Sequence, residues 1–195
     1  MAVVLDLPAS KRARAKHRLY TADDLLQMPP DSRVELIRGE LIPLPPPPGE
    51  EHGELTGTVG SYAGVYVSEN DLGRSYAAET GFKIAHNPDT VRGPDWAFTR
   101  KERLRGPSGK QHSTVVPDIV LEVRSPTQSA ESFASKIAMW ISVGVQIVWA
   151  LDPDSKTLTV HREHEVRHLG PKDTLAGEEI LPGFELPLRK VFKGR

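Results

Sequence analysis

The stretch from Ile119 to Leu151 constrains the fold more strongly than any other part of this sequence. Two short runs, Ile119 to Val123 and Gln146 to Leu151, are apolar and rich in β-branched or aromatic residues, which is typical of strands. Between them, the apolar residues of segment 131–143 recur at helical spacing, and Gly144 follows where helices often end. Strand, helix and strand in succession predict an α/β fold.

The start of this helix has two candidate caps. Ser125 to Gln128 resembles a capping box with Pro126 at the first helical position, whereas Ser129 would cap a helix that begins later. Both alternatives keep the order of strand, helix and strand.

The other segments are short, in keeping with 16 glycines and 17 prolines. We expect a short helix capped by Thr21 and a hairpin over Val34–Ile42 that turns at Arg38-Gly39. Helical spacing predicts a second helix over 51–68. Further strands are expected at 75–84, 95–99, 157–161 and 166–169, with an end segment over 181–192. The order helix, three strands, helix, strand predicts a central mixed β-sheet flanked by helices, with an N-terminal hairpin and a C-terminal β extension.

Composition excludes several classes of protein. Without cysteine, the chain has no disulfide scaffold, thiolate zinc site or cysteine nucleophile. With 25 Lys and Arg against 26 Asp and Glu, the chain is not a strongly basic protein that coats nucleic acid. A local basic patch on its surface is still compatible with this balance. No run has the length of a membrane span, so we expect a cytoplasmic protein.

The basic residues of the N-terminus form a group of their own. Residues 1–18 carry five lysines and arginines against one acid, without apolar periodicity. We expect a flexible basic tail, either a solvated terminus or a contact for nucleic-acid phosphate. Residues 19–195 are then expected to form a single domain.

Two acids stand inside apolar strands. Because side chains alternate along a strand, Asp118, Val120, Glu122 and Arg124 point to one face and Ile119, Leu121 and Val123 to the other. Burying a carboxylate without a partner is costly. Glu122 and the similarly placed Asp95 therefore need a shared cation or basic partners. Lys136 falls inside the apolar arc of its helix, so it either snorkels to water or reaches a buried acid such as Glu122.

A set of motifs in a fixed order resembles the Uma2 family of restriction endonucleases, which belongs to the PD-(D/E)XK nuclease superfamily. The motifs are Glu35-Leu-Ile-Arg-Gly-Glu-Leu, His52 at the head of a helix, Glu79-Thr-Gly-Phe82, Gly93-Pro-Asp95-Trp-Ala, Pro117 to Pro126, Lys136 and Gly177 to Phe184. The resemblance runs from about Tyr20 to Phe192, and it implies a restriction-endonuclease-like fold.

The resemblance also implies a reaction and a site. Asp95 and Glu122 match the acids that hold Mg²⁺ or Mn²⁺ in that superfamily. The usual lysine would stand at position 124, where this chain has Arg, and Lys136 matches a lysine that the following helix supplies instead. Glu35, His52, Glu79 and Arg124 are secondary candidates. Arg124 stays protonated, so it would clamp a phosphate or pair with Glu122 rather than act as a base.

A basic run and a histidine motif are two further signals, and each is interpreted from its context. Arg100, Lys101, Arg103 and Arg105 form a basic run next to the Asp95 strand, which we interpret as a solvated loop or a phosphate contact. His164-Glu-Val-Arg-His168 spells a zinc-protease string, but that string works only on a helix. In a strand the histidines of this string would lie about 13 Å apart. We therefore interpret His161, His164 and His168 as chance residues of a polar hairpin rather than as a surface metal cluster.

These expectations lead to one main functional hypothesis and one alternative. The main hypothesis is an Mg²⁺- or Mn²⁺-dependent DNA endonuclease without an organic cofactor, acting as a homodimer because two sites cut two strands in this superfamily. The alternative is a catalytically weak or inactive nuclease-fold protein that serves as a nucleic-acid-binding or structural module. Arg124 in the lysine position and the net charge of -1 favour the alternative.

Overall fold

The computed structural model describes residues 18–29 and 31–193. Residues 1–17 of the predicted basic tail lie outside this part. Arg18 lies inside it, and its guanidinium forms an ion pair with Asp24 at 2.5 Å. Arg18 is therefore anchored to the folded part of the chain.

The largest element is a six-stranded mixed sheet with the order β10-β9-β8-β7-β6-β3. Strands β7 and β8 pair in parallel, and the other neighbouring pairs are antiparallel. Its strands are β3 (Gly73–Ala77), β6 (Trp96–Arg100), β7 (Ile119–Val123), β8 (Ile147–Asp152), β9 (Thr157–His161) and β10 (Val166–Leu169). This arrangement confirms the predicted mixed sheet and the strand, helix and strand of segment 119–151.

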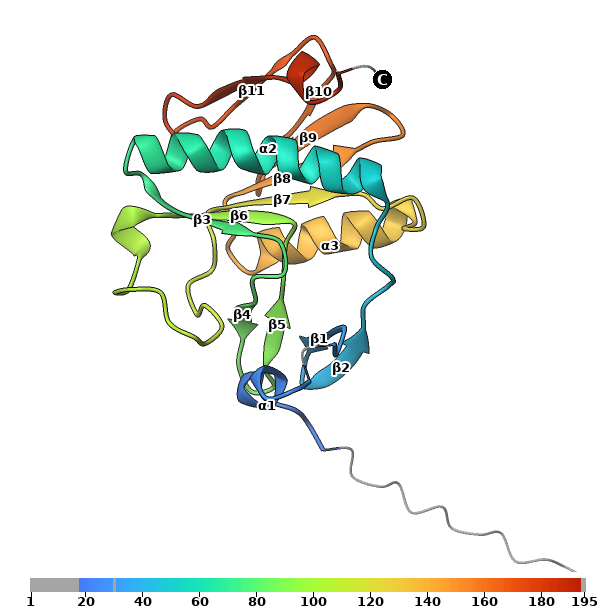
Figure 1. Cartoon of the computed structure of the whole chain (residues 1–195), viewed down its shortest axis with the longest axis vertical. Coiled ribbons are helices and arrows are strands. Elements are labelled where there is room, and N and C mark those ends of the chain that lie inside the picture. The colour runs from blue at the N-terminus through green and yellow to red at the C-terminus, as the bar shows by residue number, and fades with distance from the viewer. Residues whose placement is uncertain (1–17, 30, 194–195) are drawn as a thin grey trace, which may run out of the picture.

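Two long helices cover the two faces of this sheet (Figure 1). Helix α2 (Glu50–Glu69) packs with Ile119, Leu121 and Val123 of β7, whereas α3 (Ala130–Ser142) packs with Val120. The alternation of β7 side chains is therefore confirmed. Within the described residues, no helix combines the length and the apolar character that crossing a bilayer requires.

Ser129 caps α3, and the alternative capping box at Ser125 to Gln128 is wrong. The Ser129 hydroxyl accepts a hydrogen bond from the Ser132 N–H at 3.1 Å. The Gln128 N–H instead donates to the Ser125 carbonyl, which closes a turn ahead of the helix. At the other end, Gly144 has a φ of +99°, a conformation that favours glycine and lets the chain leave the helix.

A second, four-stranded sheet has the order β2-β1-β5-β4 and lies beside α1 (Ala22–Leu26) in Figure 1. Its strands are β1 (Val34–Ile37), β2 (Glu40–Pro43), β4 (Phe82–Ala85) and β5 (Thr90–Arg92). The hairpin turning at Arg38-Gly39 is confirmed, and both turn residues have positive φ angles. The sequence reasoning missed β5, whose three residues carry too little pattern to identify.

The strand expected over 75–84 is instead two strands in two different sheets. Strand β3 ends at Ala77 in the large sheet, and β4 begins at Phe82 in the small one. Glu79 between them has a φ of +67°, which cannot continue an extended strand. This turn carries the chain from one sheet to the other.

The C-terminal extension is confirmed as β structure. Strands β9 and β10 extend the large sheet, and β11 (Thr174–Ala176) pairs with β12 (Glu185–Pro187) in a separate two-stranded ribbon. Two short 3-10 helices, η1 (Lys101–Arg103) and η2 (Leu188–Lys190), complete the structure. The described Glu163–His168 segment is a turn followed by β10, so the expectation that it is not helical is confirmed.

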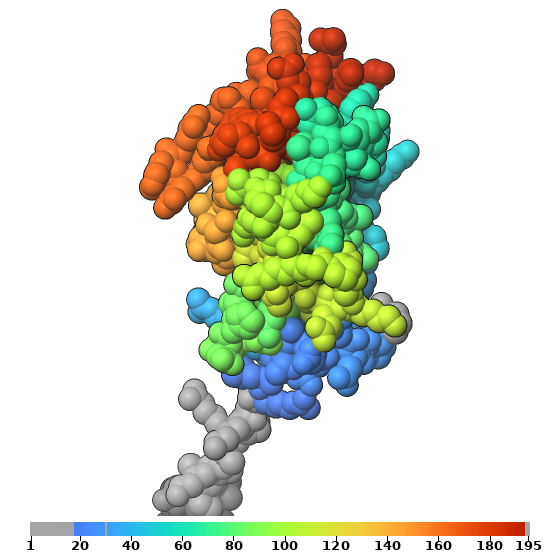
Figure 2. Space-filling view, turned by 90° about the vertical axis from the view of Figure 1, so that its left-hand side faces the viewer, coloured from blue at the N-terminus to red at the C-terminus, as the bar shows by residue number. Residues whose placement is uncertain are grey.

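The basic run of residues 100–105 directly follows the Asp95 strand, as expected, but it lies at the strand end away from Asp95 and the proposed site. It follows the far end of β6, about 16 Å along the strand at its usual rise. Figure 2 shows this yellow-green segment at the surface, in the middle of the face turned toward the viewer. Arg100 and Arg103 form ion pairs with the fully buried Asp118 at 3.0 and 2.9 Å, and Lys101 pairs with Asp71. Two of the arginines thus compensate a buried acid.

We expect Asp118→Asn to lower the free energy of unfolding by about 2–3 kcal/mol, because the buried group loses the negative charge that Arg100 and Arg103 compensate. Asp118 also accepts hydrogen bonds from the Arg100 N–H and from Gln146. Urea unfolding followed by circular dichroism measures the change. Glu102→Gln is the control, because the Glu102 side chain is 65% exposed and weakly paired. Equal midpoints and slopes for both variants would contradict this role of Asp118.

Candidate functional site

The two predicted metal ligands lie next to each other on neighbouring strands. Trp96 of β6 is opposite Leu121 of β7, so the next antiparallel position pairs Asp95 with Glu122. The Asp95 N–H donates to the Leu121 carbonyl at 3.1 Å. In return, Asp95 Oδ2 accepts the Val123 N–H at 2.7 Å. The backbone at the end of β7 thereby fixes the Asp95 carboxylate.

Glu122 is buried, with 1% of its surface exposed, and each of its carboxylate oxygens has a partner on α3. Lys136 Nζ lies 2.6 Å from Oε2, and the Trp140 Nε1–H donates to Oε1 at 2.6 Å. Lys136 and Trp140 are four residues apart, so they lie on the same face of the helix. Of the two readings of Lys136, the structure thus supports the one in which it reaches a buried acid.

Sequence reasoning missed Trp140 as a polar partner. It counted Trp140 as part of the apolar stripe of α3, which is correct but incomplete. The available signal was its position four residues after Lys136, since a buried indole N–H usually needs an acceptor.

Burial raises the pKa of Glu122 to about 7, and the neighbouring charge of Asp95 adds to this, while Lys136 opposes it. Burial alone would lower the pKa of Lys136, but the carboxylates of Glu122 and Asp95 outweigh it and raise that pKa above its usual value. Lys136 is therefore a cation at neutral pH, and Glu122 is poised between its two protonation states.

His52 connects the first turn of α2 to the same site. It is 9% exposed, and its Nε2–H donates to the Val123 carbonyl at 3.0 Å. The same nitrogen lies 3.4 Å from Asp95 Oδ2. Burial lowers the pKa of His52, but the hydrogen bond and charge of Asp95 more than compensate and raise it above 6.5. Asp95 thus stabilises the charged form of His52.

Glu35 reaches the site from β1, but it is already paired. Its Oε1 lies 2.9 Å from Arg92 Nε and accepts the Gly93 N–H at 3.4 Å. Its charge contributes to the raised pKa of Lys136, which places it in the same electrostatic environment. The structure therefore brings Glu35 to the edge of the site with a salt-bridge partner of its own.

The remaining secondary candidates differ in position. Glu79 lies in the turn between β3 and β4 and lines the same cleft as His52 and Asp95. Arg124 does not pair with Glu122, contrary to one of its two expected roles. Its Nη1 lies 3.0 Å from Asp152 Oδ2, and its Nε donates to the Gln128 carbonyl. Asp152 ends β8, the parallel neighbour of β7, which explains why it reaches Arg124.

The site opens into a cleft of about 1300 Å³ between the two sheets and the N-terminal half of α2. His52, Asp95 and Lys136 line it on one side, and Glu35 and Arg92 of the small sheet line it on another. The cleft is also lined by apolar residues near the N-terminus, namely Leu25, Leu26, Met28, Pro29, Leu44, Pro45, Pro46 and Pro48. A polar, titratable cluster thus meets an open cleft large enough for an extended substrate.

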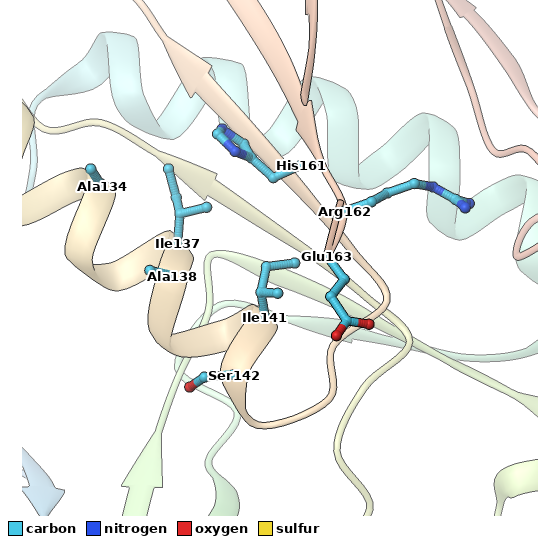
Figure 3. Close-up of a pocket in the computed structure, with 8 residues that line it drawn as sticks. All are labelled: Ala134, Ile137, Ala138, Ile141, Ser142, His161, Arg162 and Glu163. Carbon is cyan, nitrogen blue, oxygen red and sulfur yellow. The ribbon is translucent and has the colours of Figure 1, made fainter. Parts of the chain in front are cut away.

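A second hollow of about 450 Å³ lies between α3 and the end of β9 (Figure 3). The side of α3 that lines it carries Ala134, Ile137 and Ile141, and none of the predicted site residues contributes to its lining. Arg162 points away from the helix in this view, in keeping with its ion pairs to Glu178 and Glu179. This hollow lacks the paired acids of the larger cleft.

Metal binding at this site would depend on the oxygens of Asp95 and Glu122. Among residues 18–29 and 31–193, no three His, Asp or Glu side chains gather as a set of metal ligands. His168 in β10 instead contacts Thr159 Oγ1 across the hairpin at 3.1 Å. The candidate metal ligands are therefore the two carboxylates of Asp95 and Glu122, which are hard ligands suited to Mg²⁺ or Mn²⁺.

Comparisons with known proteins bear on the family and the fold. A family model described as "Putative restriction endonuclease" (Uma2) matches residues 22–189. The crystal structure of a putative nuclease belonging to DUF820 from Anabaena variabilis ATCC 29413 superimposes with a TM-score of 0.73 and 23% identity, covering 88% of this chain and 97% of that one. At this identity, the similarity shows the fold. No curated protein matches the sequence.

We expect the Glu122 carboxyl to titrate near pH 7 in the metal-free protein, because it is buried. The folded state then holds a proton that the unfolded chain has lost, so this group makes stability fall as pH rises from about 4.5 to 7. Carbon-13 NMR of the Glu122 side-chain carboxyl measures the midpoint. Lys136→Met should raise it further by removing the attractive charge. A midpoint at the ordinary glutamate value would contradict the burial argument.

Proposed function

The chain belongs to the Uma2 family of restriction endonucleases, and we propose that it hydrolyses phosphodiester bonds of DNA with the help of Mg²⁺ or Mn²⁺. The family supports a hydrolase that acts on nucleic acid. The observation that carries the finer proposal is the junction of Asp95, Glu122 and Lys136 beside an open cleft, with Lys136 only 2.6 Å from Glu122. The DNA substrate, the cation and a cytoplasmic homodimer are parts of the proposal.

The donor chemistry of the site fits a small divalent cation. Mg²⁺ is usually bound through one or two carboxylates, with waters and substrate phosphate oxygens at the other positions. Asp95 and Glu122 supply two such carboxylates from adjacent strands. The polar contacts of the Asp95 side chain within the described residues both involve Oδ2, so Oδ1 remains for a ligand. When bound, the cation would lower the pKa of a water and offset charge on the phosphoryl oxygens.

Lys136 would act as a positioned cation rather than as a base. Its raised pKa keeps the ammonium protonated at neutral pH, so it can donate hydrogen bonds to an attacking water or to a phosphate oxygen. Its side chain lines the cleft and is 22% exposed, so it can reach a substrate there. His52 would hold the Asp95 carboxylate in place through its 3.4 Å contact.

A second candidate function, a nuclease-fold module that binds nucleic acid without turnover, is favoured by Arg124. This residue occupies the usual lysine position and is engaged with Asp152 instead of the site. Both oxygens of Glu122 also have partners in the chain already. A protein of this kind would bind DNA with strong salt dependence and would show no metal-dependent cleavage.

Nicking of supercoiled plasmid with Mg²⁺ or Mn²⁺ tests the proposal. We expect the purified protein to nick the plasmid, and Asp95→Asn and Glu122→Gln to reduce nicking to the level without metal, because each removes a charged ligand. Glu163→Gln is the matched control, since this glutamate has a side chain that is 80% exposed. Equal nicking by all four proteins would indicate a contaminating nuclease. Metal-independent DNA binding without cleavage would support the second candidate.

A pair of variants tests which basic side chain, Lys136 or Arg124, assists the reaction. Lys136→Met should lower the cleavage rate by about 100-fold or more, the usual effect of losing a donor that stabilises developing charge. Arg124→Met should retain most of the activity, because its guanidinium is tied to Asp152. Initial rates on the same plasmid give the comparison, with thermal melting to verify folding. The reverse order of effects would assign the catalytic cation to Arg124.

A further inference from the structure

We infer that Trp140 is a positioning residue for Glu122, holding the carboxylate in the orientation that the proposed cation requires. The inference rests on the proposed function, since it assigns Trp140 a role in metal loading. Sequence reasoning gave this residue an apolar role alone, and its contact with Glu122 goes beyond packing.

The two oxygens of the Glu122 carboxylate have different partners. Oε1 accepts the Trp140 Nε1–H at 2.6 Å on the side of the buried core. Oε2 faces Lys136, which lines the cleft. Because an indole can only donate, Trp140 cannot exchange its role for that of an acceptor. Trp140 therefore fixes one oxygen, and the other remains on the side from which a cation would approach.

The two partners of Glu122 differ in their freedom to move. Trp140 is fully buried, and it belongs to the same packed cluster as Phe133 and Ile137 of α3 and Val120 and Val148 of the sheet. Its side chain cannot rotate without disturbing that core. Lys136 has a flexible stem and is partly exposed, so it can give way to a cation at Oε2. Trp140 is thus the partner that keeps Glu122 oriented both before and after loading.

The chain contains a matched comparison in Trp149. This tryptophan is also fully buried, but it lies on the opposite face of the sheet, stacked with Trp96 at a ring-centroid distance of 5.7 Å. Its Nε1 has no hydrogen-bond partner among the described residues. Replacing either tryptophan by Phe removes the same atoms from an apolar core, but only the change at position 140 takes a donor away from Glu122.

The first test measures Mn²⁺ binding by the full chain, using electron paramagnetic resonance of the free ion. We expect Trp140→Phe to weaken Mn²⁺ binding by about 10–100-fold, the usual cost of losing a residue that orients a metal ligand. Trp149→Phe should bind Mn²⁺ like the wild type, even if both variants lose thermal stability. Equal affinity in Trp140→Phe and wild type would overturn the inference.

The second test measures the NMR chemical shift of the indole Nε1–H in the wild-type protein, with Mg²⁺ as the probe. The Trp140 Nε1–H resonance, assigned by its loss in Trp140→Phe, should shift on Mg²⁺ addition, while the Trp149 resonance stays in place. An unchanged Trp140 resonance at saturating Mg²⁺ would count against the inference.

A third variant covers the case in which Trp140→Phe does not fold. Site-specific replacement of Trp140 by β-(3-benzothienyl)alanine keeps the ring volume and substitutes sulfur for the N–H, and it should weaken Mn²⁺ binding as Trp140→Phe would. Wild-type affinity in this variant would contradict the inference while leaving the proposed metal site intact. A wild-type protein that binds no Mn²⁺ would overturn the proposed metal site and the inference together.

Discussion

Glu122 places a carboxylate inside a sheet, where 1% of the residue is exposed and an ion without partners would cost several kcal/mol. One face of α3 offsets this free-energy cost, because it supplies the Lys136 ammonium and the Trp140 indole N–H as partners of Glu122. Both contacts require α3 to lie across β7 in one rotational setting. The Ser129 cap and the apolar stripe that packs on the sheet provide that setting.

Strand β7 and the residue before it contain two buried acids, and the surroundings of these two acids differ. Asp118 accepts hydrogen bonds from Arg100 and Gln146 and pairs with Arg103, at the end of the strand away from the cleft. Glu122 instead adjoins a second acid, Asp95, whose charge helps to raise its pKa. Burial of an acid alone therefore does not identify a site. The neighbouring like charge and the open cleft distinguish Glu122.

Local patterns in the sequence predicted much of this arrangement. The two-residue period of β7 placed Glu122 on the same face as Val120, and the helical period of α3 placed Lys136 on its packed side; the structure confirms both. The same reasoning failed where partners come from distant segments. It joined β3 and β4 into one strand, missed β5, placed the Arg100 run near the proposed site and did not find the ion pair of Arg124 with Asp152.

The sequence by itself determined which faces of β7 and α3 carry the polar residues, because side-chain periodicity follows from local backbone geometry. It also determined that the ligands on offer are oxygens, since the chain has no cysteine. Only the tertiary structure decided which charges meet. Pairing β6 with β7 placed Asp95 beside Glu122, and crossing α3 over the sheet gave Glu122 both of its partners. Such contacts depend on which elements become neighbours in space, which local periodicity does not encode.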